Sequence, residues 1–599
     1  MSASPKSAPA SPPLQAPLPR ASSYRTHTCG ELRPGHVGQK VTLCGAVDRS
    51  LDERGFELRD EHGKVLVRLT DAGAERLAVY GVTRPTPESV LQVRGTVDER
   101  KPPGASPTGH VQVTADEADV LSPAKAPLLF DFRDDALPRA DRIRHRYLYL
   151  RKPAVHEAFA ERTRILAAVR RFLAVRRFVE VETPVLANRW TPEATDAFLA
   201  VREPGQVFAL PGRRAVHAAL LVASGFDRTF EVARRFVRKK TYGPFEQPEF
   251  SVLELTMSFA GLKDLTRLED DLLAEIGRAV RELKVAVHEI AYEDALARYG
   301  TDAPDLRVEL EIRDLTPFAP AEVRSALGAS GAVRAIRLEA KALSAAGDAS
   351  KRDALLAEQV KRFEGKKATV QLLAIGAESK ATVAASTGLV AESLVPLVPK
   401  TLDARAGDVV LLVVAKERAV AAAISGEVRQ AVGRALGLVS GARLAFARVT
   451  ELPYQRFDPE AGAFVAHADP LAHPLGSDLD GDPRRARALA HDLVLNGVTV
   501  GGGAVRNHDL EVQRRAFEVQ GLGAMDVDAR HGRLLEALRY GLPPSGRIAI
   551  GIDRMIALLL GFESIDEVQA LPKMADGTDP LCRAPWPIDP QVVRALFQV

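Results

Sequence analysis

One stretch near the C-terminus constrains the fold more than any other part of the chain. Isoleucines at positions 548, 550 and 552 alternate with small or polar residues, which is the period of a half-buried strand. The run from Met555 to Gly561 that follows is apolar and long enough for a core helix. Arg554 therefore lies at a strand-to-helix junction.

Size and composition indicate a multidomain protein without a membrane span. The chain has 599 residues, too many for one core at roughly 100 to 200 residues per domain. Apolar residues make up 46% and charged residues 27%, as in soluble globular proteins, and the net charge is +3. Any binding of nucleic acid must then come from local basic patches. No window approaches the roughly 18 consecutive apolar residues that cross a membrane.

The N-terminus and the cysteines suggest a cytoplasmic protein with a disordered arm. Residues 1–23 are rich in Pro, Ser and Ala and contain no apolar stretch fit for a signal peptide, so we expect a disordered extension there. Cys29, Cys44 and Cys582 lack the close spacing of a zinc site or a redox dithiol. They indicate a reducing, cytoplasmic location.

Residues 24–122 have the pattern of a small β-barrel. Strand-like runs at 40–47, 65–69, 90–97 and 111–113 are separated by Gly, Asp and Pro turns. Short strands of this kind suit a Greek-key barrel of the oligonucleotide-binding (OB) type. On pattern alone, the alternative is a strand-rich domain that binds nothing.

Two later segments have patterns of their own. Phe159, Leu166, Val169 and Leu173 recur at helical spacing, which predicts a helix packed on a core. Between residues 311 and 431 the composition shifts to Ala, Val, Lys and Glu, with strand and helix patterns in alternation.

Several motifs together resemble the bacterial aspartyl-tRNA synthetases, a family of class II aminoacyl-tRNA synthetases. Residues 546–554, with 492–497 and the triple glycine 501–503, are similar to the third signature motif of class II enzymes. Residues 178–184 look like the first motif, and residues 24–32 resemble part of the anticodon-binding domain. The resemblance spans the chain from Tyr24 onward.

The resemblance implies a multidomain α+β fold. An OB-fold anticodon-binding-like domain at 24–122 would precede a class II catalytic domain with an antiparallel sheet, formed by 123–310 and 432–599. An inserted α/β domain of the bacterial type would occupy 311–431. The resemblance also implies tRNA as a partner and a homodimer, because the proline of the first motif lies at the dimer interface in the family.

ATP would be bound mainly by arginines. In class II enzymes the third-motif arginine packs on the adenine and faces the γ-phosphate, so the resemblance assigns Arg554 to catalysis and ATP binding, beside Gly551 and Asp553. A guanidinium suits this role because it is planar, permanently charged and able to stack. In the second motif, one extra residue places Arg238 at the position of the phosphate-binding arginine, and Lys240 where the family has glutamate. The alternative is that Arg238 points into solvent.

The amino-acid pocket departs from the family pattern. The resemblance assigns Arg506 to the aspartate side chain and Glu193 to the mobile loop that closes over the ligand. Ala215 and Ala218 stand where the family has glutamine and lysine, and neither can hydrogen-bond or carry charge through its side chain. Loss of a charged partner from a buried clamp typically costs on the order of 2 to 5 kcal/mol.

The metal site is altered as well. ATP and Mg²⁺ are the implied cofactors, and Asp492 is kept as a magnesium ligand, but Thr499 replaces its partner glutamate. Mg²⁺ is usually held by one or two carboxylates plus substrate phosphates, so we expect a weakened site. Ala468 and Asp469 precede Pro470 where the family has paired histidines.

In the barrel, the resemblance assigns three residues to RNA. Phe56 matches the aromatic on which an anticodon base stacks, a contact worth roughly 1 to 3 kcal/mol per base. Leu66 replaces the base-reading glutamine, so we expect stacking without base selection. Arg49 and Arg59 are candidates for contacts with the RNA backbone.

Three functional hypotheses follow from these departures. The first is an active aspartate-tRNA ligase with a rearranged site. The second is a divergent paralogue that has poor or no aspartylation activity and keeps the fold for RNA binding or a regulatory partnership. The third is an adenylate-forming ligase for another carboxylate or acceptor. We favour the second, because independent substitutions affect the substrate, metal and anticodon positions together.

Overall fold

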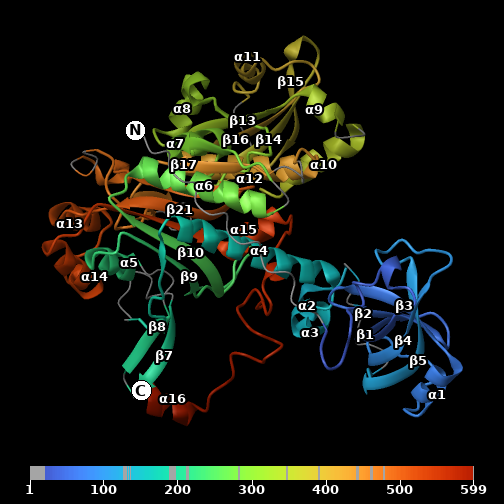
Figure 1. The fold of residues 1–599 in the computed structure, drawn as a ribbon. Helices are drawn as coiled ribbons and strands as arrows, with labels where there is room; N and C mark the ends of the chain where they lie inside the picture. The colour runs from blue at the N-terminus through green and yellow to red at the C-terminus, as the bar shows by residue number, and fades with distance from the viewer. Residues whose placement is uncertain are drawn as a thin grey trace, which may run out of the picture. The chain divides into compact units, whose positions relative to one another are not determined.

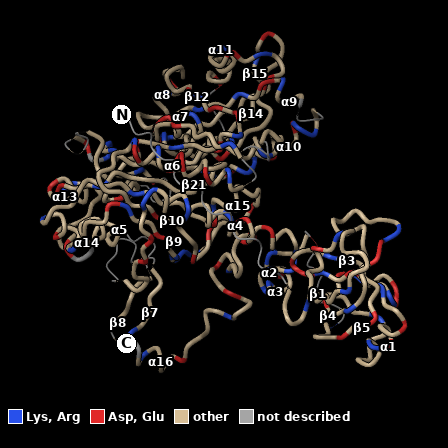
Figure 2. The backbone as a smooth tube through the Cα atoms, in the orientation of Figure 1, with Lys and Arg blue, Asp and Glu red and all other residues tan. Residues whose placement is uncertain are grey.

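The chain folds as a multidomain α+β protein (Figure 1). The computed structural model describes residues 21–597 except 126–130, 132–133, 135, 188–196, 205, 211–214, 281–282, 346–348, 389–391, 440–443, 459–462, 477–478 and 480. Two compact units are distinguished, Met1–Leu137 with Leu148–His156, and Pro138–Tyr147 with Glu157–Val599. Basic and acidic residues are interspersed along both units (Figure 2), in keeping with the net charge of +3.

The first unit is built on a closed five-stranded barrel, the OB-like barrel that the strand pattern predicts. The strand order is β1-β2-β3-β5-β4, and β3 and β5 are parallel while the other neighbouring pairs are antiparallel. Helix α1 begins after Thr70, whose hydroxyl oxygen accepts a hydrogen bond from the Gly73 N–H at 3.2 Å. The elements are η1 (Pro34–His36), β1 (Lys40–Ser50), β2 (Gly55–Asp60), β3 (Gly63–Leu69), α1 (Asp71–Ala78), β4 (Val90–Glu99) and β5 (Val111–Ser122).

The second unit contains an eight-stranded sheet in the order β11-β17-β20-β21-β22-β10-β9-β6. The inner pairs are antiparallel, and only the outermost pair at each edge is parallel. The strands are β6 (Val179–Glu180), β9 (Arg228–Phe236), β10 (Glu249–Ser258), β11 (Val287–Ala291), β17 (Phe446–Thr450), β20 (Ala490–Leu495), β21 (Val498–Arg506) and β22 (Ser545–Gly551).

Three helices cover one face of this sheet: α4 (Pro153–Val175), α6 (Leu262–Ala279) and α15 (Ile552–Leu559). Their apolar side chains share one core with Leu253, Ile548 and Ile550 of the sheet. The predicted strand and core helix near the C-terminus are confirmed as β22 and α15, with the helix beginning at Ile552. Successive residues of a strand point to opposite faces, so Arg547 and Ala549 lie on the face that these helices leave open.

A second sheet lies within residues 311–431, the range predicted as an inserted domain. Its five strands follow the order β12-β13-β16-β14-β15, and all neighbouring pairs are antiparallel. Separate hydrophobic clusters lie on its two faces, so helices pack on both sides. The elements are β12 (Ile312–Asp314), η3 (Thr316–Phe318), α8 (Ala321–Leu327), β13 (Ala332–Leu338), α9 (Ala340–Ala345), α10 (Ala349–Lys361), β14 (Ala368–Ile375), η4 (Ala377–Ser379), β15 (Ala381–Ser386), α11 (Leu397–Leu402), β16 (Val409–Ala415) and α12 (Arg418–Ala435).

The remaining elements are two hairpins and several short helices. The hairpins are β7 (Phe198–Glu203) with β8 (Gln206–Leu210), and β18 (Gln455–Asp458) with β19 (Ala463–Ala466). The helices are α2 (Arg139–Arg144), α3 (Arg146–Tyr149), α5 (Ala215–Ala223), α7 (Tyr292–Tyr299), η6 (Pro483–Arg485), α13 (Leu510–Val519), α14 (Ala524–Arg539), η7 (Ile565–Val568) and α16 (Pro590–Phe597). Among the described residues, no helix combines the length and the apolar character that crossing a membrane requires.

Candidate active site

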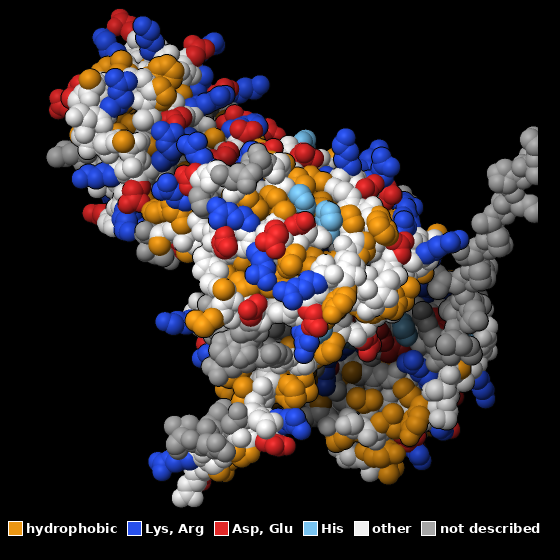
Figure 3. Space-filling model, turned by 90° about the vertical axis from the view of Figure 1, so that its left-hand side faces the viewer, with side chains coloured by type: hydrophobic (Ala, Val, Ile, Leu, Met, Phe, Trp, Pro, Cys, Tyr) orange, Lys and Arg blue, Asp and Glu red, His pale blue; other side chains and the backbone are white. Residues whose placement is uncertain are grey.

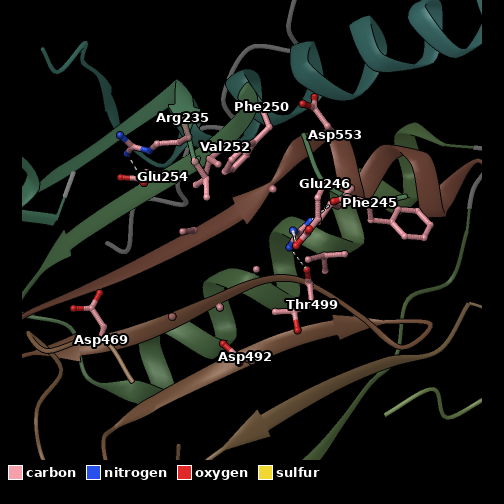
Figure 4. A pocket seen from close by; sticks show the side chains of 18 of the residues that line it. Arg235, Phe245, Glu246, Phe250, Val252, Glu254, Asp469, Asp492, Thr499 and Asp553 are labelled. Carbon is pink, nitrogen blue, oxygen red and sulfur yellow. Dashed lines mark hydrogen bonds and ion pairs between the residues drawn. The ribbon is translucent and has the colours of Figure 1, made fainter. Parts of the chain in front are cut away.

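A cavity of about 740 Å³ opens on the face of the eight-stranded sheet that α4, α6 and α15 do not cover. Strands β9, β10, β20, β21 and β22 form its floor, and the loop that follows β9 and the segment that follows β19 form its sides (Figure 4). Gly501, Gly502 and Gly503 of β21 line the cavity without side chains. A cavity of this size fits the roughly 300 to 1,000 Å³ that ligand sites occupy.

Charged side chains of alternating sign cross the floor of the cavity. Arg235 of β9 pairs with the Glu254 carboxylate of β10, and Arg547 Nη2 of β22 lies 2.6 Å from Glu254 Oε1. Beyond Arg547 the order continues with Asp469 and then with Arg506 of β21. We call these five residues the charge row. Arg235 is 1% exposed, so the row begins in the protein interior.

Sheet register places the four strand residues of the charge row, Arg235, Glu254, Arg547 and Arg506, on one face. Arg235 is paired with Phe250, Glu254 with Ala549, and Ala504 with Arg547, and paired residues of neighbouring strands point to the same side. Burial alone would raise the pKa of Glu254, but the charges of Arg547 and Arg235 outweigh burial and lower this pKa to about 2. Glu254 is therefore a carboxylate at every physiological pH.

Asp469 closes the charge row. Its Oδ1 lies 2.7 Å from Arg506 Nη1, and its Oδ2 lies 3.7 Å from Arg547 Nη1. Its side chain is 14% exposed and lies at the cavity wall. Arg506, which the resemblance assigns to a substrate carboxylate, is thus at the cavity but already faces a carboxylate of the protein.

Arg554 lies at the cavity wall, as the resemblance implies. Its Nε donates to the Phe245 carbonyl at 2.7 Å and its Nη1 to the Thr499 carbonyl at 3.0 Å, while its Nη2 lies 3.7 Å from Glu246 Oε1. Burial lowers the pKa of Arg554, and Glu246 acts in the opposite direction. The guanidinium is held in a fixed orientation with its remaining surface toward the cavity.

Asp553 reaches the cavity wall but is occupied by structural contacts. Its Oδ1 accepts from Arg162 Nη1 at 2.5 Å, and its Oδ2 accepts from the Ser251 N–H at 3.0 Å and from Gln569 Nε2 at 2.7 Å. Asp553 is 2% exposed. This carboxylate ties α4, β10 and the segment after α15 together, and its predicted contact with ATP stays a prediction. Gly551, also predicted for ATP, lines the cavity where β22 ends.

Arg238, which the resemblance assigns to catalysis and ATP binding, lies in the loop after β9. The loop after β9 is pinned by Tyr242, whose hydroxyl donates to the Val237 carbonyl at 2.8 Å and accepts from the Lys239 N–H at 2.9 Å. Arg238 is exposed and is not among the described residues that line the cavity. The arginine of this segment that faces the cavity is Arg235, three residues earlier.

Asp492 and Thr499 both line the cavity (Figure 4). Among the described residues, no group of three or more His, Cys, Asp or Glu side chains could hold a metal ion by itself. Oxygen ligands from one carboxylate would have to be completed by phosphates and water, which is how proteins commonly hold Mg²⁺. The residues present therefore fit a magnesium ion that arrives with a nucleotide.

Some predicted residues lie outside the described part of the chain. Glu193, predicted to close over the amino acid, is one of them. Ala218 lies in α5 and is half-buried.

In the barrel, the structure corrects the assignment of Phe56. This side chain is 0% exposed and belongs to the barrel core with Leu58 and Val67. A ring without an exposed face cannot stack on a base, so Phe56 stabilises the barrel. The sequence pattern of β2 indicates that Phe56 is buried, because Phe56 and Leu58 alternate with polar residues and point inward.

The two barrel arginines differ from one another. Arg49 is exposed and lies 3.6 Å from Glu57. Arg59 is mostly buried, with Nε 2.9 Å from Asp48 and Nη2 2.7 Å from Glu88. Arg49 is therefore accessible to a phosphate, whereas Arg59 is held between two carboxylates.

The residues that sequence reasoning missed are Arg235, Glu254 and Arg547, whereas Asp469 was noted only as a departure from the paired histidines of the family. Glu254 stands between Leu253 and Leu255, and Arg547 precedes Ile548, so each is a charged residue inside a strand with apolar residues on the other face. A charged residue at such a position indicates a paired, buried side chain, because the burial of an unpaired charge is costly.

Comparisons with known proteins agree with this fold. The family described as tRNA synthetases class II (D, K and N) matches residues 139–575. The chain is 35% identical to an aspartate-tRNA ligase of Geobacillus kaustophilus over 96% of its own length and 98% of that protein. It is 34% identical to an aspartate-tRNA(Asp/Asn) ligase of Syntrophomonas wolfei, with the same coverage.

Solved structures give the same result for the fold. The asparaginyl-tRNA synthetase of Pyrococcus horikoshii, in complex with asparaginyl-adenylate, matches 92% of this chain and 98% of its own, with a TM-score of 0.56 at 15% identity. The barrel, the class II sheet and the whole-length identity to aspartate-tRNA ligases lead to one conclusion. The chain belongs to the class II tRNA synthetases of the D, K and N group, in the family of the aspartate-tRNA ligases.

Proposed function

We propose that this protein binds ATP and tRNA in the manner of the aspartate-tRNA ligases but activates aspartate poorly or not at all. In this proposal it is a divergent paralogue. Its nucleotide-binding site is retained, and its metal site and its amino-acid site are weakened. The single observation that supports the proposed nucleotide-binding site is the position of Arg554 at the wall of the 740 Å³ cavity, where two backbone carbonyls fix its guanidinium.

A fixed guanidinium suits recognition of a nucleotide. Arg554 already donates hydrogen bonds to the carbonyls of Phe245 and Thr499, so its side chain loses little entropy when a ligand binds. The neighbouring strand presents Gly501 to Gly503, so a planar base or a phosphate could approach the backbone closely. Mg²⁺, when bound, would neutralise the phosphates, and Asp492 is the residue proposed to hold it.

The proposed weak activation of aspartate follows from the residues that form the cavity wall. Thr499 contributes a hydroxyl at the position where a second carboxylate is expected, so the proposed site has fewer negative charges for Mg²⁺. Activation joins two anions, the amino-acid carboxylate and the α-phosphate, and therefore depends on neutralisation by metal and cations. A weaker metal site lowers the rate of adenylate formation before it abolishes ATP binding.

The direct test is ATP binding by calorimetry together with pyrophosphate exchange for each standard amino acid. We expect the wild-type protein to bind Mg·ATP and to show little or no exchange with aspartate. Rapid exchange with aspartate would establish an active ligase with a rearranged site. Exchange with another amino acid would establish a different carboxylate substrate, and absence of ATP binding would overturn the proposal.

One variant pair addresses the metal site. Thr499→Glu adds a carboxylate at the wall near Asp492, and Thr499→Gln adds a side chain of the same length without charge. The glutamate variant should bind ATP more tightly as Mg²⁺ is raised, whereas the glutamine variant should not. If ATP binding by the two variants depends equally on Mg²⁺, the residue at position 499 does not affect the metal site.

tRNA binding, dimerisation and location complete the proposal. The exposed Arg49 of the barrel is the proposed RNA contact, testable by filter binding of a tRNA pool to the wild type and to Arg49→Ala. A homodimer is proposed because Val179, Val185 and Leu186, in and after β6 at the sheet edge, are 40–52% exposed, and light scattering would measure it. A cytoplasmic location is proposed from the free cysteines.

The second candidate, an active ligase with a rearranged site, is favoured by one observation. Arg235 and Arg547 bring two more guanidinium groups to the cavity floor, and either could replace a lost cation of the amino-acid clamp. Arg235, however, is 1% exposed and paired with Glu254, so it offers little uncompensated charge to a ligand.

A further inference from the structure

The end of the charge row contains a clamp for a carboxylate. Arg547 is the cross-strand partner of Ala504, and Arg506 lies two residues beyond Ala504 on the same strand, so both side chains point to the cavity face. Both are nearly buried, with 11% and 8% of their side chains exposed. Two guanidinium groups on neighbouring strands are well suited to hold a carboxylate in a cavity.

Asp469 occupies this clamp. One of its oxygens lies 2.7 Å from Arg506 Nη1 and the other lies 3.7 Å from Arg547 Nη1, so a single carboxylate lies against both arginines. The side-chain carboxylate of a dicarboxylic ligand would lie between the same two groups. Asp469 comes from the segment after β19 and not from the sheet itself.

The segment that carries Asp469 is held in place by its backbone. Ala472 forms an isolated β-bridge with Arg506, and the Ala472 N–H donates to the Asp469 carbonyl at 2.9 Å. Asp469 Oδ1 also accepts from the Leu471 N–H at 3.0 Å. Gln520 Nε2 donates to the Ala468 carbonyl at 2.9 Å. The carboxylate is therefore presented to Arg506 by a fixed turn.

The pairing satisfies the charge of Arg506 but not its geometry. Among the described residues, neither Nη1 nor Nη2 of Arg506 has a hydrogen-bond acceptor in good geometry, although both atoms are buried. The contact with Asp469 is thus an ion pair without the two parallel hydrogen bonds that a guanidinium can give to a well-placed carboxylate. The clamp is built for a carboxylate and is filled imperfectly by this one.

We propose that Asp469 is an internal pseudo-ligand: its carboxylate fills the Arg506–Arg547 clamp in place of the side chain of a dicarboxylic amino acid and excludes that ligand. This inference rests on the proposed function and explains why the proposed activation of aspartate is weak. A tethered carboxylate competes at a high effective concentration, and a second carboxylate beside it would meet a like charge. Removal of the Asp469 charge should open the clamp to a free dicarboxylate.

The test compares ligand binding by wild type and Asp469→Asn, measured by calorimetry without ATP or tRNA. Asparagine keeps the size of the side chain and an oxygen for the Leu471 N–H, but it removes the charge. We expect Asp469→Asn to bind L-aspartate and succinate at least roughly 10-fold more tightly than the wild type, since loss of one like charge at close range is worth a factor of that order. L-asparagine should bind both proteins equally, because it lacks the second carboxylate.

Three further variants decide whether the gain in aspartate affinity requires the Arg506–Arg547 clamp. Asp469→Asn combined with Arg506→Met should lose the gain, because Arg506 supplies the stronger contact. Asp482→Asn is the matched control: Asp482 pairs with Arg484 at the surface, and its loss should leave aspartate binding as in the wild type. Asp469→Ser, also uncharged, should reproduce the gain, so the test does not depend on one variant folding.

The outcomes separate this inference from the proposed function. If Asp469→Asn and Asp469→Ser fold and show no gain, or if wild type binds aspartate as tightly as they do, the pseudo-ligand inference is overturned. A gain for asparagine as large as that for aspartate would also overturn it, because charge would not be what the clamp recognises. None of these results bears on Mg·ATP binding or pyrophosphate exchange by the wild type, which test the proposed function separately.

Discussion

Replacement of Glu254 by glutamine (Glu254→Gln) removes the carboxylate that lies against both Arg235 and Arg547. Glutamine has the same size and keeps one oxygen that can accept a hydrogen bond, so the variant mainly removes charge. Two buried guanidinium groups then lose their shared anion. Breaking a buried ion pair in this way is typically far more costly than breaking one at the surface.

The magnitude follows from the pKa of Glu254, which falls from 4.5 to about 2 in the folded protein. At about 1.4 kcal/mol per pKa unit, the folded protein favours the charged form of this carboxylate over the neutral form by about 3 kcal/mol. Glutamine resembles the neutral form. The free energy of unfolding of Glu254→Gln should therefore be lower than that of the wild type by about 3 kcal/mol at pH 7.

The pH dependence has a definite sign. The folded-state pKa of Glu254 is depressed, so the stabilisation is complete above the ordinary pKa of 4.5 and is lost as the pH falls toward about 2. The difference between wild type and Glu254→Gln should stay constant from pH 7 to pH 5.5. By pH 3 about 2 kcal/mol of it should have disappeared, because the carboxyl group is then mostly protonated in the unfolded chain.

The assay is urea denaturation followed by circular dichroism at each pH, and the difference between variants is the quantity of interest. Glu536→Gln is the matched control, since Glu536 pairs with Arg533 on the exposed surface of α14 and its loss should cost at most about 1 kcal/mol. A loss below about 1 kcal/mol for Glu254→Gln at pH 7, or a loss that does not change between pH 5.5 and pH 3, would refute the reasoning.

Three further predictions concern the corrected and retained residues. Phe56→Ala should lower the free energy of unfolding of the barrel by about 3 to 5 kcal/mol, because the ring is fully buried; a stable variant with weakened tRNA binding would restore the stacking role. Asp553→Asn should cost about 3 to 5 kcal/mol of stability through its pair with Arg162, while the folded variant still binds ATP; denaturation and calorimetry measure the two effects. Arg554→Ala should weaken ATP binding by roughly 10- to 100-fold, the worth of one hydrogen bond to a charged group, and unchanged affinity would exclude Arg554 from the nucleotide site.

Surface charge is mixed on one face of the molecule. Basic and acidic side chains are intermixed over the face shown in Figure 3, in agreement with the near-neutral chain. Contacts with tRNA would then depend on individual residues such as Arg49, and binding should weaken with added salt in proportion to the few phosphates contacted.

Local pattern was sufficient for the elements that bury a regular apolar face. The alternation of Ile548 and Ile550 predicted β22, and the apolar run after Arg554 predicted α15, because one side of each element packs on the same core. The four strand-like runs of the barrel were also recovered, together with the family to which the motifs belong. These features depend on the period of the chain, which is a local property.

What only the tertiary structure decided is which charged residues meet. Arg235 reaches Glu254 through the register of β9 against β10, and Asp469 reaches Arg506 from a segment that is distant in sequence. The sequence by itself determined that arginines and carboxylates are present in the motif regions. Strand pairing turned Arg235 of β9 toward the cavity, because each position on a strand can face only one side of the sheet. Arg238 lies in the loop after β9 and is exposed.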